Sequence, residues 1–213
     1  LAANIVDEVF GAPGQHSSLE ILIGIYAYAV QIYADFSGYT DIAIGLALLL
    51  GFTFPRNFDS PYAATSIQDF WRRWHMTLSR WLRDYVYIPL GGNRGGRLFT
   101  YRNLMLTMLI GGLWHGAGWT FVAWGGIHGL ALVAERWWRD RPGYVEKPAT
   151  AWSLAWKRIV TFHVVCFGWI FFRSDSFADA WDLIVRLFTA WGEPSPLVTG
   201  GVLAAIAVGI GSQ

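Results

Sequence analysis

The stretch that decides the fold is residues 103–134, which read NLMLTMLIGGLWHGAGWTFVAWGGIHGLALVA and contain no Asp, Glu, Lys or Arg in 32 positions. Glycines at positions 116 and 118 interrupt this stretch next to His115. Each half has roughly 12 to 16 residues, fewer than the ~20 that a helix needs to cross a bilayer. The sequence therefore predicts a hairpin of short helices over residues 103–135, with the geometry of a re-entrant membrane segment.

The flanks of this predicted hairpin are basic on both sides. Seven arginines and one acid lie between residues 71 and 102, and further basic residues lie between Arg136 and Arg158. Because an excess of Lys and Arg marks cytoplasmic segments, both flanks are predicted to be cytoplasmic. Non-helical backbone at membrane depth is tolerated only inside protein or beside a water-filled cavity. We therefore expect the break at Gly116 to line a cavity.

The composition of the whole chain also indicates a membrane protein. Of the 213 residues, 54% are hydrophobic and only 15% are charged, compared with about 25% charged residues in soluble domains. Further apolar blocks cover residues 18–54, 152–173 and 197–213. The sequence predicts an all-α fold, with one multi-pass transmembrane domain over residues 1–213.

The first apolar block, residues 18–54, carries Asp35 and Asp41 on either side of Gly38. Unpaired carboxylates are costly inside a membrane. This interruption predicts two helices or one broken helix, in which the carboxylates cap helix ends, pair with arginines or line an internal tunnel.

A different pattern covers residues 66–88. Written as a helix, this segment places its large apolar side chains on one face and most of its arginines on the other, which is typical of a helix that lies in the membrane interface. The apolar stripe consists of Trp71, Trp74, Leu78, Trp81 and Tyr85, and the basic face of Arg72, Arg73, Arg80 and Arg83. His75 lies at the boundary between the faces, and the helix is expected to end at Pro89.

Several classes of protein and site are disfavoured. A net charge of +1 gives no reason to expect nucleic-acid binding, and the single cysteine, Cys166, excludes an internal disulfide. The five histidines show no zinc-type spacing, so no metal is expected. The chain begins without methionine and ends within an apolar run. We therefore expect it to be part of a longer protein and to be inactive in isolation.

Four motifs, in this order along the chain, carry a resemblance to a known family. They are QIYADFSGYTDIAIGLALLLGF (31–52), NFDSPYAATSIQDFWRRWHMTLSRWLRDYVYIPLGGNRGG (57–96), GGLWHGAGWTFVAWGGIHG (111–129) and GWIFFRSDSFADA (168–180). Together they resemble the C-terminal half of membrane-bound O-acyltransferases, most closely the bacterial alginate O-acetyltransferase membrane subunits.

The resemblance implies a function and a site. Family members move an acyl group from a cytoplasmic thioester donor, here expected to be acetyl-CoA, through a tunnel toward a hydroxyl acceptor. In the polysaccharide branch, periplasmic partner proteins complete O-acetylation of a polymer such as alginate. The chain is thus expected in the lipid of a bacterial inner membrane. The essential histidine corresponds to His115, and a second functional position to His75. The tunnel or substrate lining is expected to include Trp74, Trp114, Gly116, His128 and Asp41.

Elementary chemistry independently favours a histidine base. A thioester is already activated, so transfer to a hydroxyl mainly needs a base and a group that stabilises the oxyanion. A neutral imidazole is the least costly base to place in a membrane. His128 lies 13 residues beyond His115, about 20 Å along a continuous helix, and is expected to be structural or to line the tunnel.

One alternative function and one structural interpretation remain open. A non-catalytic transporter or channel would use the intramembrane histidines and aspartates as an ion or proton path. The aromatic pair Phe171 and Phe172 is interpreted as an anchor in the membrane interface.

Overall fold

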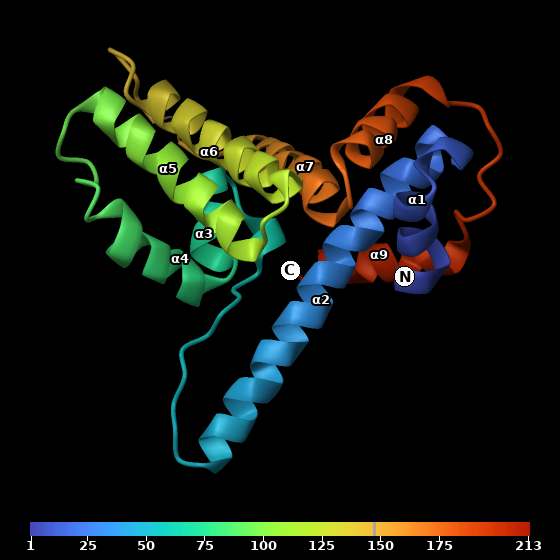
Figure 1. Ribbon diagram of the computed structural model, residues 1–213, viewed down its shortest axis with the longest axis horizontal. Helices are drawn as coiled ribbons and strands as arrows, with labels where there is room; N and C mark the ends of the chain where they lie inside the picture. Colours follow the sequence, from blue (N-terminus) through green and yellow to red (C-terminus); the bar gives the residue numbers. More distant parts are fainter. Residues whose placement is uncertain (147) are drawn as a thin grey trace.

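The computed structural model describes residues 1–146 and 148–213, and these residues form helices joined by turns and loops, without a strand. Lys147, one of the basic residues of the second flank, lies outside the described residues. Nine α-helices follow one another along the chain (Figure 1): α1 (Asp7–Gly11), α2 (Ser18–Leu49), α3 (Ile67–Arg73), α4 (Met76–Leu82), α5 (Arg97–His115), α6 (Trp119–Arg139), α7 (Ala151–Arg173), α8 (Phe177–Thr189) and α9 (Gly200–Gly211) within the described residues.

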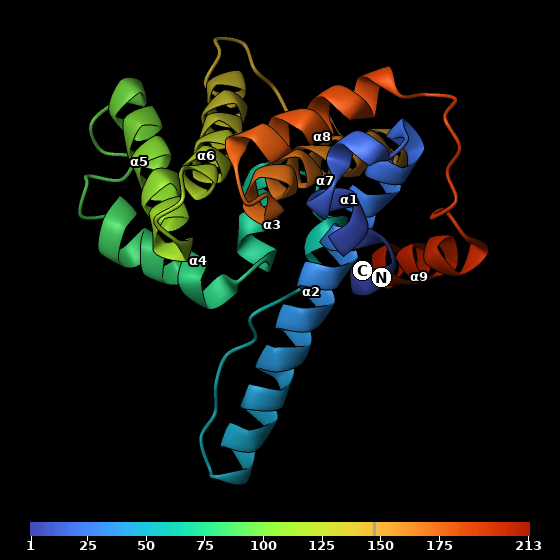
Figure 2. The same cartoon turned by 45° about the vertical axis from the view of Figure 1, so that its right-hand side comes forward.

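Helix α2 is one unbroken helix of 32 residues, so the predicted break between Asp35 and Asp41 is wrong. The side chain of Ser17 accepts a hydrogen bond from the backbone N–H of Glu20 and caps the first turn. A single glycine costs a helix only about 1 kcal/mol, which a long apolar helix tolerates at Gly38. The second half of α2 projects from the body of the molecule (Figures 1 and 2) and exposes large apolar side chains such as Leu49.

Helices α5 and α6 form an antiparallel hairpin whose turn is residues 116–118 (Figure 1). They have 19 and 21 residues, because helix continues into the basic flanks that the sequence places outside the hairpin. The helices approach closely at two glycines. A Cβ atom on Gly112 would lie 2.3 Å from the Phe121 carbonyl oxygen, and one on Gly125 would lie 2.4 Å from that of Met108. Glycine at both positions therefore allows this backbone contact.

The segment predicted as one interfacial helix over residues 66–88 is broken, so that prediction is wrong in its continuity. Helices α3 and α4 are separated by Trp74 and His75, and α4 runs into a π-helical turn, η4 (Arg83–Tyr87). His75 has φ 42° and ψ 55°, a left-handed conformation that a continuous α-helix does not contain. The apolar residues of this segment follow helical spacing in the sequence, but the break at Trp74 and His75 ends one helix and starts another, so they do not form one continuous face.

Within the described ranges, two helices, α2 and α7, are long and apolar enough to cross a membrane. Helix α8, which the sequence pattern did not reveal, follows α7 after the turn at Ser174.

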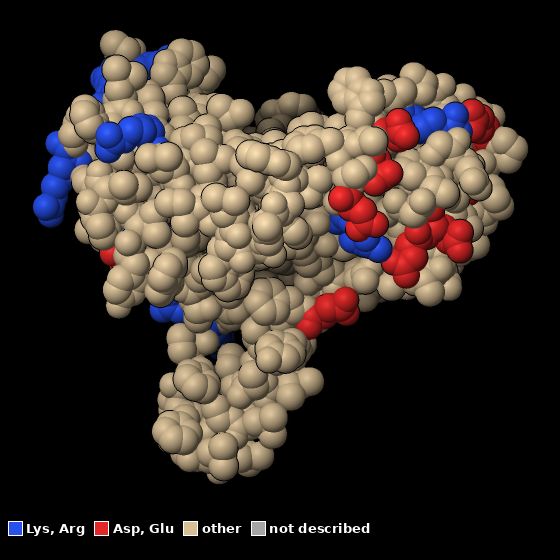
Figure 3. Space-filling model, in the orientation of Figure 1, with Lys and Arg blue, Asp and Glu red and all other residues tan. Residues whose placement is uncertain are grey.

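Acidic and basic side chains lie mainly on different parts of the molecule. Figure 3 shows Asp and Glu mainly over α1 and α8, and Lys and Arg mainly at the opposite edge, where α5 begins.

Candidate functional site

His115 is the last residue of α5, where the hairpin turns. Its half-buried ring packs against Trp124 of α6 and Phe172 of α7, with ring centroids 5.0 Å apart in both pairs. Phe121 lies near the same ring, at 6.3 Å. Three helices therefore hold the imidazole, while its place at a helix end leaves part of it accessible.

Gly116 explains how the chain turns so tightly after His115. A Cβ atom at this position would lie 2.7 Å from the Phe121 ring. Glycine thus allows Phe121 to fold back over the turn. The structure assigns Gly116 a role in shaping the turn, and its expected role as tunnel lining stays a prediction.

His75 is held in the break between α3 and α4 by Asn57. The backbone carbonyl of Asn57 accepts from the N–H of Met76 at 2.9 Å, and its side-chain Oδ1 accepts from the N–H and the hydroxyl of Thr77 at 3.1 and 2.9 Å. The His75 Nδ1 lies 3.2 Å from the same Oδ1. This buried asparagine therefore holds both the left-handed backbone and the ring.

The contact with Asn57 also fixes the tautomer of His75. Because the Thr77 backbone N–H donates to the Asn57 side-chain atom, that atom is the amide oxygen, which only accepts hydrogen bonds. The His75 Nδ1 therefore carries the proton, and Nε2 is left as an acceptor. Burial, and secondly the neighbouring His115, lower the pKa of His75 to about 4. The ring is neutral at pH 7.

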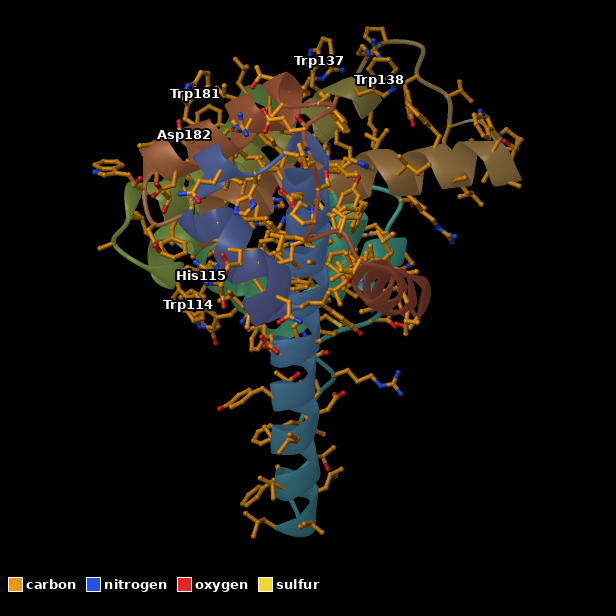
Figure 4. The ribbon with its side chains drawn as sticks, turned by 90° about the vertical axis from the view of Figure 1, so that its right-hand side faces the viewer. Trp114, His115, Trp137, Trp138, Trp181 and Asp182 are labelled. Atoms are coloured by element: carbon orange, nitrogen blue, oxygen red, sulfur yellow. The ribbon has the colours of Figure 1, made fainter. Side chains whose placement is uncertain are left out.

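The Trp114 ring contacts both histidines. Its ring centroid is 6.1 Å from that of His75 and 4.9 Å from that of His115. Phe36 of α2 also packs against His75, with the two ring centroids 4.8 Å apart. Figure 4 shows Trp114 and His115 together at the end of the hairpin remote from Trp137 and Trp138. The fold thus brings together two histidines that are 40 residues apart in the sequence.

The remaining predicted lining residues lie elsewhere. Trp74 is 4% exposed and sits in the aromatic core, stacked on Phe70. His128 is fully buried behind Trp124. Asp41 is an exposed residue in the second half of α2, and its carboxylate forms no hydrogen bond or ion pair with any residue that the structure describes. The tunnel-lining prediction for these three residues stays untested.

Sequence reasoning missed three residues that shape the site. Asn57 begins the motif NFDSPYAA, but nothing local indicates that it contacts His75, 18 positions later. Trp124 lies nine residues beyond His115, and the hairpin brings the two rings together. Phe172, which the sequence analysis interpreted as an interface anchor, instead packs on His115.

A cavity of about 640 Å³ lies between the α3–α4 segment and the basic half of the α5–α6 hairpin, and neither His75 nor His115 is among its lining residues. Met76, next to His75, contributes to its wall, as does Trp71. The lining includes five arginines, at positions 72, 80, 83, 136 and 139.

Ion pairs neutralise part of this basic lining. Glu135 pairs with Arg139, and Asp140 pairs with Arg136 at 3.0 Å. Arg72 and Arg80 form no ion pair within the described part of the chain. The cavity therefore suits a ligand that carries negative charge. Residues 1–146 and 148–213 contain no cluster of His, Cys, Asp or Glu suited to a metal ion.

Comparison with known proteins identifies relatives of the chain. The model of the membrane-bound O-acyltransferase family matches residues 15–175. The chain is 49% identical over 187 residues to the probable alginate O-acetylase AlgI of Azotobacter vinelandii, covering 88% of this chain and 36% of that protein. It is 47% identical over 180 residues to a peptidoglycan O-acetyltransferase of Helicobacter pylori, covering 84% of this chain and 33% of that protein.

A more distant relative is a teichoic acid D-alanyltransferase of Bacillus subtilis, 30% identical over 167 residues, with 73% of this chain and 42% of that protein covered. The chain spans about a third of the length of the alginate and peptidoglycan O-acetylating relatives that it matches.

Proposed function

The chain belongs to the membrane-bound O-acyltransferase family, and from this premise we propose that it forms part of an enzyme that O-acetylates an extracytoplasmic polysaccharide. The observation that carries the proposal is that the rings of His115 and His75 both contact Trp114, and that Met76, the neighbour of His75, lines a basic cavity. Relatives named for alginate and for peptidoglycan support a carbohydrate polymer as the final acceptor.

His115 is the proposed general base. It takes the proton of the acceptor hydroxyl as that oxygen attacks the thioester carbonyl carbon; the carbon–sulfur bond then breaks, and the leaving thiolate receives the proton from the imidazole. His75 is neutral, and its free Nε2 accepts a hydrogen bond from a substrate group other than the reacting hydroxyl and so orients the substrate. General-base help of this kind contributes about 10²- to 10⁴-fold to the rate.

The start of α6 supplies donors for the developing oxyanion. This helix begins at Trp119, four residues after His115, without a side-chain cap. The first N–H groups of a helix have no intrahelical partner, and the positive end of the helix dipole favours negative charge. Backbone N–H groups beside the base therefore stabilise the tetrahedral intermediate.

The basic cavity supports acetyl-CoA as the donor. Phosphate groups pair with arginine guanidinium groups, and Arg72 and Arg80 are available for this within the described residues. The excess of arginine supports a cytoplasmic position for this cavity, in a protein of a bacterial inner membrane. The acetyl group then passes through the membrane-embedded site toward periplasmic partner proteins, which complete transfer to the polysaccharide.

The test measures acetyl transfer by the intact protein in membranes, supplied with radiolabelled acetyl-CoA, its periplasmic partners and candidate polysaccharides. His115→Ala is expected to lower transfer by about 10²- to 10⁴-fold. The matched control is His163→Ala, because His163 is an exposed histidine of α7 that bonds Tyr26, and it should retain wild-type transfer. Transfer by His115→Ala at the wild-type rate would refute the proposal and favour an ion path through the same residues.

A further inference from the structure

The end of the α5–α6 hairpin remote from His115 carries large exposed apolar side chains. Leu98 of α5 is 80% exposed, and Trp137 and Trp138 of α6 are 54% and 53% exposed. Figure 4 shows the two indoles at the edge of the molecule, away from Trp114 and His115. A group of exposed apolar side chains of this size marks a surface that contacts another molecule.

A hydrogen bond holds the two helix ends side by side. The Tyr101 hydroxyl of α5 donates to Oδ2 of Asp140, the residue after α6, at 3.2 Å. Arg97, the first residue of α5, lies about one helical turn before Tyr101, and Arg141 follows Asp140. The exposed side chains of both helix ends therefore belong to one surface. We call it the hairpin-end surface, and it consists of Arg97, Leu98, Phe99, Trp137, Trp138 and Arg141.

Arg141 is held against the two indoles. Its guanidinium carbon lies 3.2 Å from the ring centroid of Trp138 and 5.2 Å from that of Trp137, both within the ~6 Å range of a cation–π interaction. Its Nε donates to the Trp138 carbonyl oxygen at 3.3 Å. Its terminal nitrogens donate to no residue among 1–146 and 148–213. The indoles thus orient a guanidinium whose remaining N–H groups are available to an anion.

The charge of the hairpin-end surface is not neutralised. Arg97 is exposed, and neither Arg97 nor Arg141 forms an ion pair within the part of the chain that the structure describes. The adjacent acid, Asp140, pairs with Arg136. The six residues of the surface do not line the basic cavity, so the hairpin-end surface is a separate feature on the outside of the molecule.

Charge and apolar area together indicate the kind of partner. Arginine guanidinium groups bind phosphate, and exposed tryptophans and aliphatic side chains insert at the boundary between headgroups and acyl chains. The surface also lies just before a candidate membrane span along the chain, because α7 begins at Ala151, soon after Arg141. An acidic phospholipid supplies both complementary parts, a phosphate for the arginines and acyl chains for the apolar side chains.

We propose that the hairpin-end surface binds acidic phospholipids of the bilayer, with the headgroup phosphate on Arg97 and Arg141 and the acyl chains against Leu98 and the two indoles. The proposal is independent of acetyl transfer, because it needs only the membrane location of the family. An acidic segment of a partner protein is the alternative occupant, and it would need no acyl chains.

The experiment titrates the intact protein in neutral detergent with phosphatidylglycerol or phosphatidylcholine of the same acyl chains, and native mass spectrometry counts the bound lipid. Wild type should bind phosphatidylglycerol more tightly. Arg97→Gln and Arg141→Gln should each weaken that binding about 5-fold, and the double variant about 20-fold, without weakening phosphatidylcholine. Arg56→Gln is the matched control, since Arg56 is exposed in the loop after α2, and it should bind both lipids as wild type does.

A second variant tests the apolar half of the surface. Leu98→Ser removes an exposed apolar side chain without changing charge, and it should weaken both lipids about 3-fold. Glycerol 1-phosphate, which has a phosphate and no acyl chains, should compete poorly with phosphatidylglycerol.

Three results would overturn the proposal. Equal affinity of wild type for the two lipids would exclude headgroup recognition and favour an acidic protein segment. Unchanged phosphatidylglycerol affinity in the double arginine variant would place the bound lipid elsewhere. Competition by glycerol 1-phosphate at the same concentration as phosphatidylglycerol would indicate a site for free phosphate.

Discussion

His115 and His128 lie on the two helices of one hairpin and contact the same indole, Trp124, yet their surroundings differ. Their ring centroids are 5.0 and 5.2 Å from that of Trp124. His115 ends α5 and is half-buried, whereas His128 lies within α6 and is 0% exposed. A base must reach its substrate, so placement at a helix end suits His115 to proton transfer. Placement inside a helix suits His128 to binding or packing.

The largest effect is expected where the hairpin itself is disturbed. Gly125→Ala places a methyl group 2.4 Å from the Met108 carbonyl oxygen, which should cost about 3 kcal/mol of unfolding free energy and separate His115 of α5 from Trp124 of α6. Gly126→Ala is the adjacent control, since its nearest neighbour atom is 3.8 Å away. Denaturant titration in detergent measures both. Equal stability of the two variants would show that close contact between α5 and α6 does not hold His115 in place.

A smaller effect is expected at the support of His75. Asn57→Ala removes the acceptor shared by Thr77 and His75 and should cost about 1–3 kcal/mol, together with part of the acetyl transfer rate. Asn4→Ala, at an exposed asparagine near the start of the chain, serves as control. Unchanged transfer and stability in Asn57→Ala would mean that the orientation of His75 does not matter.

The smallest effect concerns pH. Because burial and the neighbouring His115 lower the pKa of His75 to about 4, His75 should stay neutral down to about pH 5, below the ordinary histidine value of about 6.5. Its contribution to acetyl transfer should therefore persist as pH falls from 7 to about 5. The comparison variant is His75→Asn, which has no titrating group at this position.

The same shift affects stability in a defined direction. The unfolded chain binds a proton at His75 near pH 6.5, whereas the folded chain binds it only near pH 4. Between these values the unfolded state holds more protons, so the free energy of unfolding should fall as pH falls through this window. If the free energy of unfolding of the wild type falls no more than that of His75→Asn as pH falls across this window, the result would contradict burial of a neutral His75 ring.

Local signals in the sequence predicted part of the site. Glycines beside His115 marked the turn, because glycine permits tight chain reversal, and the turn lies at residues 116–118. The break at His75 was not predictable from periodicity, since a stripe that continues past it reads as one helix. It depends on Asn57, a contact from 18 residues away. Helix α2 was misjudged for a different reason, because the length of a helix rich in apolar residues outweighs the cost of one glycine.

The central claim is that His115 acts as the base, and chemical rescue tests it most directly. Acetyl transfer by His115→Ala would be measured with increasing imidazole, with His128→Ala measured in parallel. Because His115 is partly accessible and His128 is not, imidazole should restore transfer to His115→Ala, with a pH dependence set by the added base, and should not restore it to His128→Ala. A folded His115→Ala that imidazole fails to rescue, or rescue confined to His128→Ala, would contradict the assignment of His115.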